Sequence, residues 1–224
     1  MRIAFFLYEG LTTLDIIGPH DVLSRLPGAE AISVSKDGAP VMADTGVLGL
    51  TATHSMAEVD TCDVLVVPGG LEGTTAAAQD QEILTWIRSV TADATWITSV
   101  CTGALILGAA GLLDGKRATT HWAAMEQLAA TGAEPVRERV VRDGHIVTGA
   151  GVSAGIDMAL TLMAELAGED VAKIIQLGIE YDPAPPFDCG SPDKAPAAIV
   201  ELAGGAVSSS SGEEREPNAS LGRF

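Results

Sequence analysis

Apolar and polar positions along the chain follow two different periods. Short runs of consecutive apolar residues are typical of strands buried on both faces. Between them lie longer stretches whose apolar positions recur with the 3.6-residue period of a helix. Strands are predicted at residues 2–8, 30–35, the start of 62–73, 95–100 and twice within 138–151. Helices are predicted within residues 9–26 and from Thr102, and at 80–92, 120–132, 153–168 and 169–181.

This alternation of strands and helices predicts one fold class. A helix that connects two parallel strands packs on a face of the sheet, so several such helices cover both faces. We therefore expect a three-layer α/β/α sandwich with a mostly parallel, flavodoxin-like sheet. Residues 1–204 are expected to form this single domain. Residues 205–224 are polar and of low complexity and are expected to form a flexible C-terminal tail.

Glycine and proline mark the less regular segments. The Gly18-Pro19 pair is predicted either to break the first helix or to begin it. Alternation and glycines within residues 39–55 indicate a small hairpin, and Asp143-Gly144 is predicted to form a tight turn between two strands. Residues 182–192 are rich in proline and are expected to be extended.

One uncharged stretch, residues 94–113, is long enough to cross a bilayer. Threonines and glycines dilute its hydrophobicity, and its first half has strand character while its second half has helix character. A buried central strand followed by a buried helix explains the missing charge, so no membrane partner is expected. The N-terminal apolar run reaches Glu9 without a small-residue cleavage site, and we interpret it as a first strand rather than a signal peptide.

Composition narrows the function classes. The formal net charge of −17 repels phosphate backbones, which argues against a nucleic-acid partner. With 47% hydrophobic and only 4% aromatic residues, the core is expected to consist mainly of Ala, Val, Leu and Ile. Cys62, Cys101 and Cys189 provide no disulfide framework and favour reduced thiols in the cytoplasm. No Cys-x-x-Cys pair or His-rich cluster in the sequence indicates a metal site.

Ligands of parallel sheets bind beyond the carboxyl ends of the strands, so the loops after Tyr8, Val67 and Val100 are candidate sites. The third loop places Cys101 between an apolar strand and a small-residue helix, in TWITSVCTGALILG. A cysteine at such a turn matches the geometry of a nucleophile elbow, where the helix amides and dipole favour the thiolate. A buried structural cysteine is the alternative.

The other two loops offer a charge-stabilising turn and an acid. The second loop, PGGLEG, places Gly69 and Gly70 directly after a buried strand, where free backbone amides would stabilise a developing negative charge. A plain tight turn is the alternative.

In the first loop, Asp15 is flanked by apolar residues, which tend to raise the pKa of a carboxyl group and make it a general acid. A helix N-cap or a solvated charge is the alternative there.

Taken together, the three loops resemble the ThiJ/PfpI superfamily, the single-domain relatives of class I glutamine amidotransferases. The superfamily pattern is an acidic residue after the first strand, a Pro-Gly-Gly turn and a cysteine in a nucleophile elbow, here Asp15, Pro68-Gly69-Gly70 and Cys101. The resemblance covers the chain from Met1 to about Pro192. Within the superfamily, the chain is most similar to the isocyanide hydratases through TLDIIGPHDVL, SVCTGALILGAAGLLDGKRATTHW, GAGVSAGIDMAL and IEYDPAPPFDCGSP.

This resemblance implies an activity and residue roles. Isocyanide hydratases add water to an R–N≡C group and release an N-substituted formamide. Their nucleophile, acid/base partner and assisting threonine correspond to Cys101, Asp15 and Thr102. The resemblance further implies a thioimidate intermediate, no metal or organic cofactor, and a homodimer. The candidates for substrate contact or charge stabilisation are Gly69, Gly70, Leu71, Thr120 and His121, although His121 also fits the start of a helix.

Other members of the superfamily keep alternatives open. The chain fits another cysteine-dependent enzyme, such as a glyoxalase, deglycase or amidase, although glyoxalase and deglycase members have glutamate where Asp15 stands. Peptidase-like members have histidine where Thr102 stands, and transcription regulators continue into a helix-turn-helix region. A non-enzymatic redox sensor, in which Cys101 is oxidised, is the third possibility. Cys62 and Asp157 are expected to be structural, with Asp157 paired in a buried setting, and Cys189 to have no catalytic role.

Overall fold

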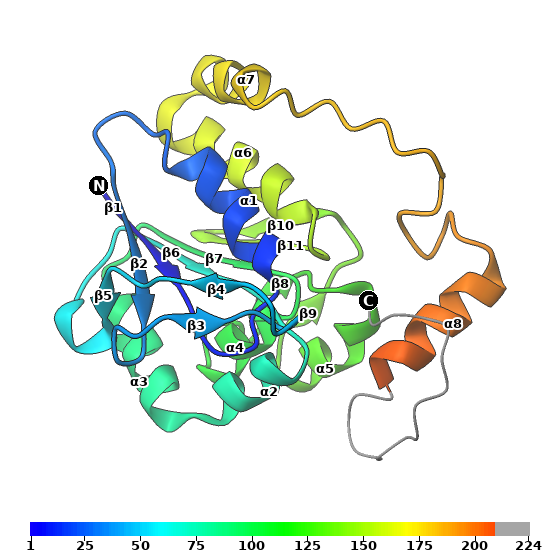
Figure 1. Cartoon of the computed structure of the whole chain (residues 1–224), viewed down its shortest axis with the longest axis horizontal. Helices are drawn as coiled ribbons and strands as arrows, with labels where there is room; N and C mark the ends of the chain where they lie inside the picture. Colours follow the sequence, from blue (N-terminus) through cyan, green and yellow to red (C-terminus); the bar gives the residue numbers. More distant parts are fainter. Residues whose placement is uncertain (209–224) are drawn as a thin grey trace. The chain divides into compact units, whose positions relative to one another are not determined.

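The structure is a computed structural model that describes residues 1–208, and it divides into a unit of residues 1–181 and a second unit that begins at Asp182. The first unit is organised around a seven-stranded sheet with the order β10-β11-β7-β6-β1-β2-β5 (Figure 1). Its strands are β1 (Arg2–Phe6), β2 (Glu30–Ser35), β5 (His54–Ser55), β6 (Val64–Val67), β7 (Trp96–Val100), β10 (Val140–Asp143) and β11 (Ile146–Gly149).

The sheet is parallel except at one edge. β2, β1, β6, β7 and β11 run parallel in this spatial order, which is the flavodoxin-like order 2-1-3-4-5. β10 pairs antiparallel with β11 through the predicted Asp143-Gly144 turn. The predicted fold class is therefore confirmed, together with the strands and the turn.

Helices cover both faces of this sheet (Figure 1). One layer packs α1 and α7 against α6, and the other packs α2, α3 and α5 against α4. The first layer consists of α1 (Thr13–Leu23), α6 (Ala154–Ala167) and α7 (Glu169–Gly178). The second consists of α2 (Glu72–Gln79), α3 (Gln81–Val90), α4 (Gly103–Ala109) and α5 (Met125–Ala130).

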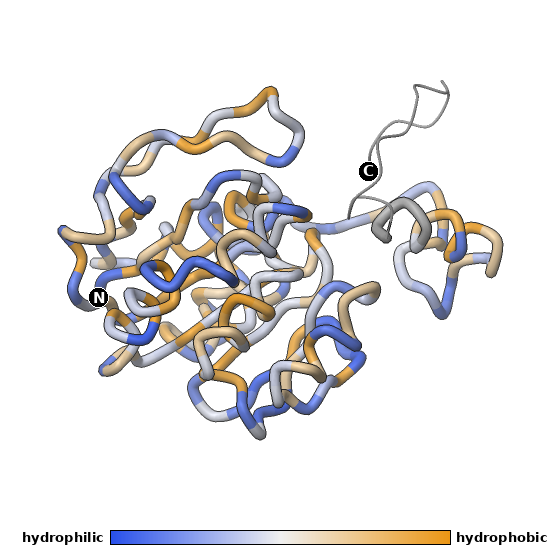
Figure 2. Tube along the Cα trace, turned by 90° about the horizontal axis from the view of Figure 1, so that it is seen from below, coloured by the Kyte–Doolittle hydropathy of each residue, from blue (hydrophilic) through white to orange (hydrophobic). Residues whose placement is uncertain are grey.

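The core of this unit is aliphatic, as its composition predicts. Every residue of β6 and β7 is buried, because helices cover both faces of these central strands. Hydrophobic and hydrophilic segments alternate along the chain trace, with hydrophilic segments at many of the outer turns (Figure 2). The uncharged stretch at 94–113 divides into β7 and α4, and no helix in residues 1–208 is long and apolar enough to cross a membrane.

Two helices differ from their prediction. α1 continues through Pro19, although Gly18-Pro19 was expected to break or begin it. The close contact between α1 and α6 explains why the helix continues. Glycines allow this contact, because a Cβ at Gly155 would lie 3.1 Å from Pro19 Cδ and a Cβ at Gly18 would lie 3.0 Å from Ile156 Cγ1. Close packing of the two helices thus offsets the hydrogen bond that proline cannot make.

The stretch predicted as one helix at 120–132 is shorter and broken. It begins as a 3-10 turn, η2 (Trp122–Ala124), and becomes α-helical only in α5. The His121 side chain caps the turn by accepting the Ala123 amide. α2 was not predicted, because two threonines and a glycine in EGTTAAAQ mask its helical character.

The smaller elements lie at the edges. The hairpin predicted within 39–55 is present as β3 (Val41–Met42) and β4 (Gly49–Leu50). A second pair, β8 (Arg117–Ala118) and β9 (Glu134–Pro135), is parallel, and η1 (Met56–Glu58) follows β5.

Among its described residues, 182–208, the second unit contains one helix, α8 (Ala197–Ser208), which extends past the predicted domain boundary at residue 204. The rest of the predicted flexible tail, residues 209–224, lies outside the described residues. The boundary and the tail therefore stay predictions.

Candidate active site

Three loops meet at the carboxyl edge of the central strands. β6 lies between β1 and β7 and is parallel to both, so the loops that follow these strands leave the sheet at one edge. The amide of Gly69, after β6, donates to Asp15 Oδ2 at 2.9 Å. The Cys101 thiol, after β7, lies beside the same carboxyl group, and each influences the other's pKa. The structure thus brings together the three loops that the sequence predicts.

Cys101 occupies a strained turn between β7 and α4. Its φ of +57° is rare for a residue with a side chain. Its amide donates to the carbonyl oxygens of Gly149 at 3.0 Å and Ala150 at 2.8 Å, and its own carbonyl accepts a hydrogen bond from Thr120 Oγ1 at 2.8 Å. These bonds hold the unusual backbone conformation. The geometry is that of a nucleophile elbow with cysteine in place of serine.

Asp15 lies in the first turn of α1 and is fully buried. Burial raises the pKa of its carboxyl group to about 7, although the hydrogen bond from Gly69 opposes the rise. Its Oδ1 atom accepts no hydrogen bond of standard geometry from residues 1–208. A buried oxygen without a donor is well suited to carry a proton, so the carboxyl group can act as a general acid near neutral pH.

The pKa of Cys101 differs from the sequence-based expectation. Burial raises the pKa of the thiol, and the negative charge of Asp15 raises it further, whereas the amides of Val152 and Thr102 lower it. The predicted lowering of the Cys101 pKa by backbone amides is therefore present, but it is smaller than the rise caused by burial. The Asp15 carboxylate disfavours a Cys101 thiolate, whereas the hydrogen bond from Cys101 lowers the pKa of Asp15. The pair is therefore a coupled site that holds one proton above the pKa of Asp15.

Thr102 connects the cysteine loop to the Pro-Gly-Gly loop. Its Oγ1 atom lies 3.1 Å from the Gly70 amide, 2.8 Å from the Gly70 carbonyl oxygen and 2.8 Å from Thr74 Oγ1. Thr74 in turn lies 3.1 Å from the buried Tyr8 hydroxyl, which donates to the Pro68 carbonyl oxygen at 2.9 Å. A continuous hydrogen-bond chain therefore runs from Tyr8, in the loop after β1, through Thr74 on α2 to the cysteine loop.

The amides of Gly69 and Gly70 are not free, in contrast to the expectation for an oxyanion site. Gly69 donates to Asp15 and Gly70 donates to Thr102. Both glycines are needed for close approach, because a Cβ at Gly69 would lie only 2.6 Å from the Thr102 amide nitrogen. Within this structure the two amides position side chains. Leu71 begins α2 as its N-cap and is 42% exposed.

Thr120 and His121 lie in the segment before α5, and Thr120 contacts the cysteine loop. Thr120 is buried and holds the Cys101 carbonyl, as described above. His121 is half-buried beside Gly151, where a Cβ would lie 2.8 Å from its Cδ2 atom. Burial lowers the pKa of His121, so its ring is neutral near pH 7. Among residues 1–208, no group of three His, Cys, Asp or Glu side chains is placed to hold a metal ion.

Comparison with known proteins identifies the family. The model of the DJ-1/PfpI family matches residues 1–165. The chain belongs to this family. Isonitrile hydratase from Pseudomonas putida is 52% identical to it over 203 residues, which are 91% of this chain and 88% of that protein. This confirms the family that the three loops resemble.

Solved structures agree with this assignment. A ThiJ/PfpI family protein from Pseudomonas syringae superposes with a TM-score of 0.90 at 44% identity, over 93% of this chain and 86% of that one. DJ-1beta from Drosophila melanogaster superposes with a TM-score of 0.72 at 26% identity, over 80% of this chain and 97% of that one. The match covers the layers that carry the candidate site.

The structure also places Asp157, Cys62 and Cys189, for which the sequence predicts no catalytic role. Asp157 anchors Arg139, whose Nη2 atom lies 2.6 Å from Asp157 Oδ2, and accepts a hydrogen bond from the Tyr181 hydroxyl at 2.9 Å. It is paired as expected, but half-buried rather than buried. Cys62 is buried and its pKa is raised to about 12 by burial. Cys189 belongs to the second unit and, like the other two cysteines, is free.

Sequence reasoning missed the roles of Tyr8, Thr74 and Asp44. Asp44 follows β3 and accepts a hydrogen bond from Thr12 Oγ1 at 2.6 Å, and its charge contributes to the raised pKa of Asp15. Val152 has a φ of +29°, an outlier for a β-branched residue. None of these contacts is local, so a single sequence carries no signal for them.

Proposed function

We propose that this DJ-1/PfpI chain is an isonitrile hydratase, a hydro-lyase that adds water to R–N≡C and releases an N-substituted formamide. The proposal rests on the 52% identity to the Pseudomonas putida isonitrile hydratase over 91% of the chain. The observation that carries the chemistry is the buried Asp15 carboxyl, with a pKa of about 7, beside the Cys101 thiol. Such a pair supplies a nucleophile and a proton to the same carbon atom.

In the first half of the reaction, the Cys101 sulfur attacks the terminal carbon of the isocyanide. The single proton of the pair resides on Asp15 when the sulfur is a thiolate. A new S–C bond forms, and the Asp15 proton is transferred to the former isocyanide carbon. The product is a thioimidate, R–N=CH–S–Cys101, and Asp15 is left as a carboxylate.

In the second half, the Asp15 carboxylate takes a proton from a water molecule as its oxygen attacks the thioimidate carbon. Asp15 passes this proton to the imine nitrogen, which gives a tetrahedral adduct with hydroxyl and thioether groups and leaves Asp15 as a carboxylate. The C–S bond then breaks, the hydroxyl proton returns to Asp15, and R–NH–CHO leaves. The thiolate and the protonated acid are both restored, so the net reaction consumes one isocyanide and one water. These steps use no metal or organic cofactor.

We assign supporting roles to the neighbours. Thr102 assists by placing its amide next to the reacting sulfur, while its hydroxyl ties the cysteine loop to Gly70. Thr120 holds the Cys101 carbonyl, and Gly69 and Gly70 orient Asp15 and Thr102. Leu71 and His121, which is neutral, remain candidates for substrate contact.

We also propose that the enzyme is a cytoplasmic homodimer. A cytoplasmic location suits a mechanism that needs a reduced thiol, and the three cysteines are free. The dimer is inferred from the family resemblance of the sequence.

The proposal is tested by formamide production from cyclohexyl and p-nitrophenyl isocyanides. The wild-type chain should turn over at least one of them, and Cys101→Ala should abolish turnover because the nucleophile is lost. Asp15→Asn should reduce it by about 10²-fold or more, the usual size of a general-acid contribution. Cys189→Ala and the surface variant Asp60→Asn serve as matched controls and should retain activity.

Absence of turnover by the wild-type chain would refute the hydratase. The next measurements would then be methylglyoxal consumption and peroxide oxidation of Cys101, which distinguish the glyoxalase-type enzyme from the redox sensor.

A further inference from the structure

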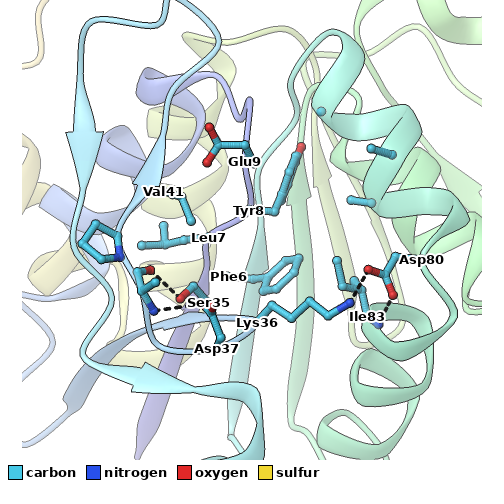
Figure 3. Close-up of a pocket in the computed structure, with 15 residues that line it drawn as sticks. Phe6, Leu7, Tyr8, Glu9, Ser35, Lys36, Asp37, Val41, Asp80 and Ile83 are labelled. Carbon is cyan, nitrogen blue, oxygen red and sulfur yellow. Dashed lines mark hydrogen bonds and ion pairs between the residues drawn. The ribbon is translucent and has the colours of Figure 1, made fainter.

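A cavity of about 330 Å³ opens at the carboxyl ends of β1 and β2 (Figure 3). β1 forms its back, the chain leading into the β3–β4 hairpin forms one side, and α2 with the start of α3 forms the other (Figure 3). Neither Cys101 nor Asp15 lines it. The cavity is therefore distinct from the candidate active site, although it lies where α/β proteins commonly bind ligands.

The wall of this cavity is apolar and largely preformed. Its back and sides include Phe6, Leu7, Val41, Ala77 and Ile83, all of them buried in the unit. An apolar wall of this size accommodates a compact hydrocarbon group.

The charged groups at the cavity are mostly acidic. Lys36, the basic residue of the lining, is already held by Asp80 at 2.6 Å and by Glu82 at 2.9 Å. Glu9 and Asp37 form no ion pair with any residue of the described chain. The cavity thus has a negative balance that its own lysine does not neutralise.

Glu9 is fixed in place. Its Oε2 atom accepts a hydrogen bond from the Met42 amide at 2.9 Å, which ties the carboxylate to β3. Figure 3 shows this carboxylate at one end of the cavity and the Lys36–Asp80 ion pair at the opposite end. A preorganised carboxylate loses little entropy when it binds a cation.

We propose that this cavity is a second binding site, specific for a small organic cation that carries an ammonium group on a compact hydrocarbon body. The ammonium group pairs with Glu9, and the hydrocarbon body covers the apolar wall. An anion is disfavoured because Lys36 is already doubly paired, and a neutral molecule forgoes the Glu9 interaction. The occupant also contacts Tyr8, a lining residue whose hydroxyl begins the hydrogen-bond chain to Thr102.

Calorimetric titration with cyclohexylammonium, a cation at neutral pH, tests the site in the full chain. We expect saturable binding that is at least tenfold tighter than binding of the neutral isostere cyclohexanol. Glu9→Gln should weaken it at least tenfold, and Ala76→Leu, which fills the cavity from α2 without changing charge, should abolish it. Glu126→Gln, an exposed carboxylate on α5, is the matched control and should bind as the wild type does.

Five results would overturn the proposal. Equal affinity for cyclohexanol, or undiminished binding by Glu9→Gln, would show that no cation is recognised. Undiminished binding by Ala76→Leu, or loss of binding in Cys101→Ala, would place the ligand elsewhere. Absence of saturable binding by the wild-type chain would remove the site. The unfolding midpoint of each variant is also measured without ligand. A midpoint equal to that of the wild type shows that the variant is folded.

Discussion

At the residue scale, burial determines the chemistry of the site. Asp15 and Cys101 are both removed from water, and a charge on either is costly, so the pKa of each is raised. The proposed reaction needs one proton on the pair, because a doubly protonated pair has no thiolate and an unprotonated pair has no acid. kcat/KM should therefore rise with pH through about 7, as the first proton leaves the doubly protonated pair.

Asp44 provides a test of this pH dependence. The pKa of Asp15 is raised by burial first, and the negative charge of Asp44 raises it further. Asp44 is held near α1 by Thr12 Oγ1, and its amide donates to the Leu11 carbonyl oxygen at 2.9 Å. Asp44→Asn removes the charge, so the pKa of Asp15 should fall and the acidic limb of kcat/KM should move to lower pH. Activity at pH 6 should rise while the plateau stays unchanged.

The measurement is a pH profile of isocyanide hydration from pH 5 to 9. Asp60→Asn controls for the loss of one surface charge and should leave the limb in place. A limb that stays fixed or moves to higher pH in Asp44→Asn would contradict the proposed influence of Asp44 on Asp15.

At the element scale, close approach of backbones sets the position of the nucleophile. α4 begins at Gly103, where an added Cβ would collide with the carbonyl oxygen of Val67 and lie 2.7 Å from that of Pro68. Backbone atoms cannot move aside as side chains do. The start of α4 and the end of β6 are therefore pressed together, and Cys101 and Thr102 lie directly beside the contact.

Gly103→Ala should be disruptive at this contact. The added methyl group forces α4 away from β6, which we expect to lower the free energy of unfolding by about 1–3 kcal/mol, the usual cost of overpacking, and to reduce hydration activity as well. Urea denaturation measures the first and formamide production the second. Gly178→Ala is the control, because a Cβ there meets no atom within 4 Å, and it should leave both nearly unchanged. Equal stability of the two variants would show that the α4–β6 contact tolerates a side chain.

At the scale of the whole molecule, the first unit contains the sheet, both helix layers and every candidate site residue. Its last residue, Tyr181, still participates in packing, because its hydroxyl donates to Asp157 at 2.9 Å. Asp157 also holds Arg139, whose carbonyl oxygen accepts the Ala150 amide, and the Ala150 carbonyl accepts the Cys101 amide. The end of this unit is therefore connected to the nucleophile by a short series of hydrogen bonds.

A chain that ends after Tyr181 should fold on its own. We expect one cooperative thermal transition within a few degrees of that of the full chain, because the core lies within residues 1–181. A chain that ends after Gly178 loses the Tyr181 bond to Asp157 and should be less stable by about 1 kcal/mol. Calorimetry or circular dichroism distinguishes the two. Loss of the cooperative transition in the chain that ends after Tyr181 would show that the second unit is needed for folding.

The sequence by itself determined most of the strands and helices in their order, the fold class and the family. These follow from local properties, because the period of apolar residues sets each element and short motifs mark the turns. TWITSVCTGALILG predicted both β7 and α4 and the position of Cys101 between them. Helix starts were less certain, as the 3-10 turn before α5 illustrates, because caps depend on single side chains such as His121.

Only the tertiary structure decided how the candidate residues work together. The sequence identified Asp15 and Cys101, but their contact depends on β6 lying between β1 and β7, which brings distant segments to one edge. It also predicted free amides at Gly69 and Gly70, whereas folding places acceptors from other loops against both of them. Burial and hydrogen bonding are sums over neighbours that are far apart in the chain, so they exist only once the fold has assembled them.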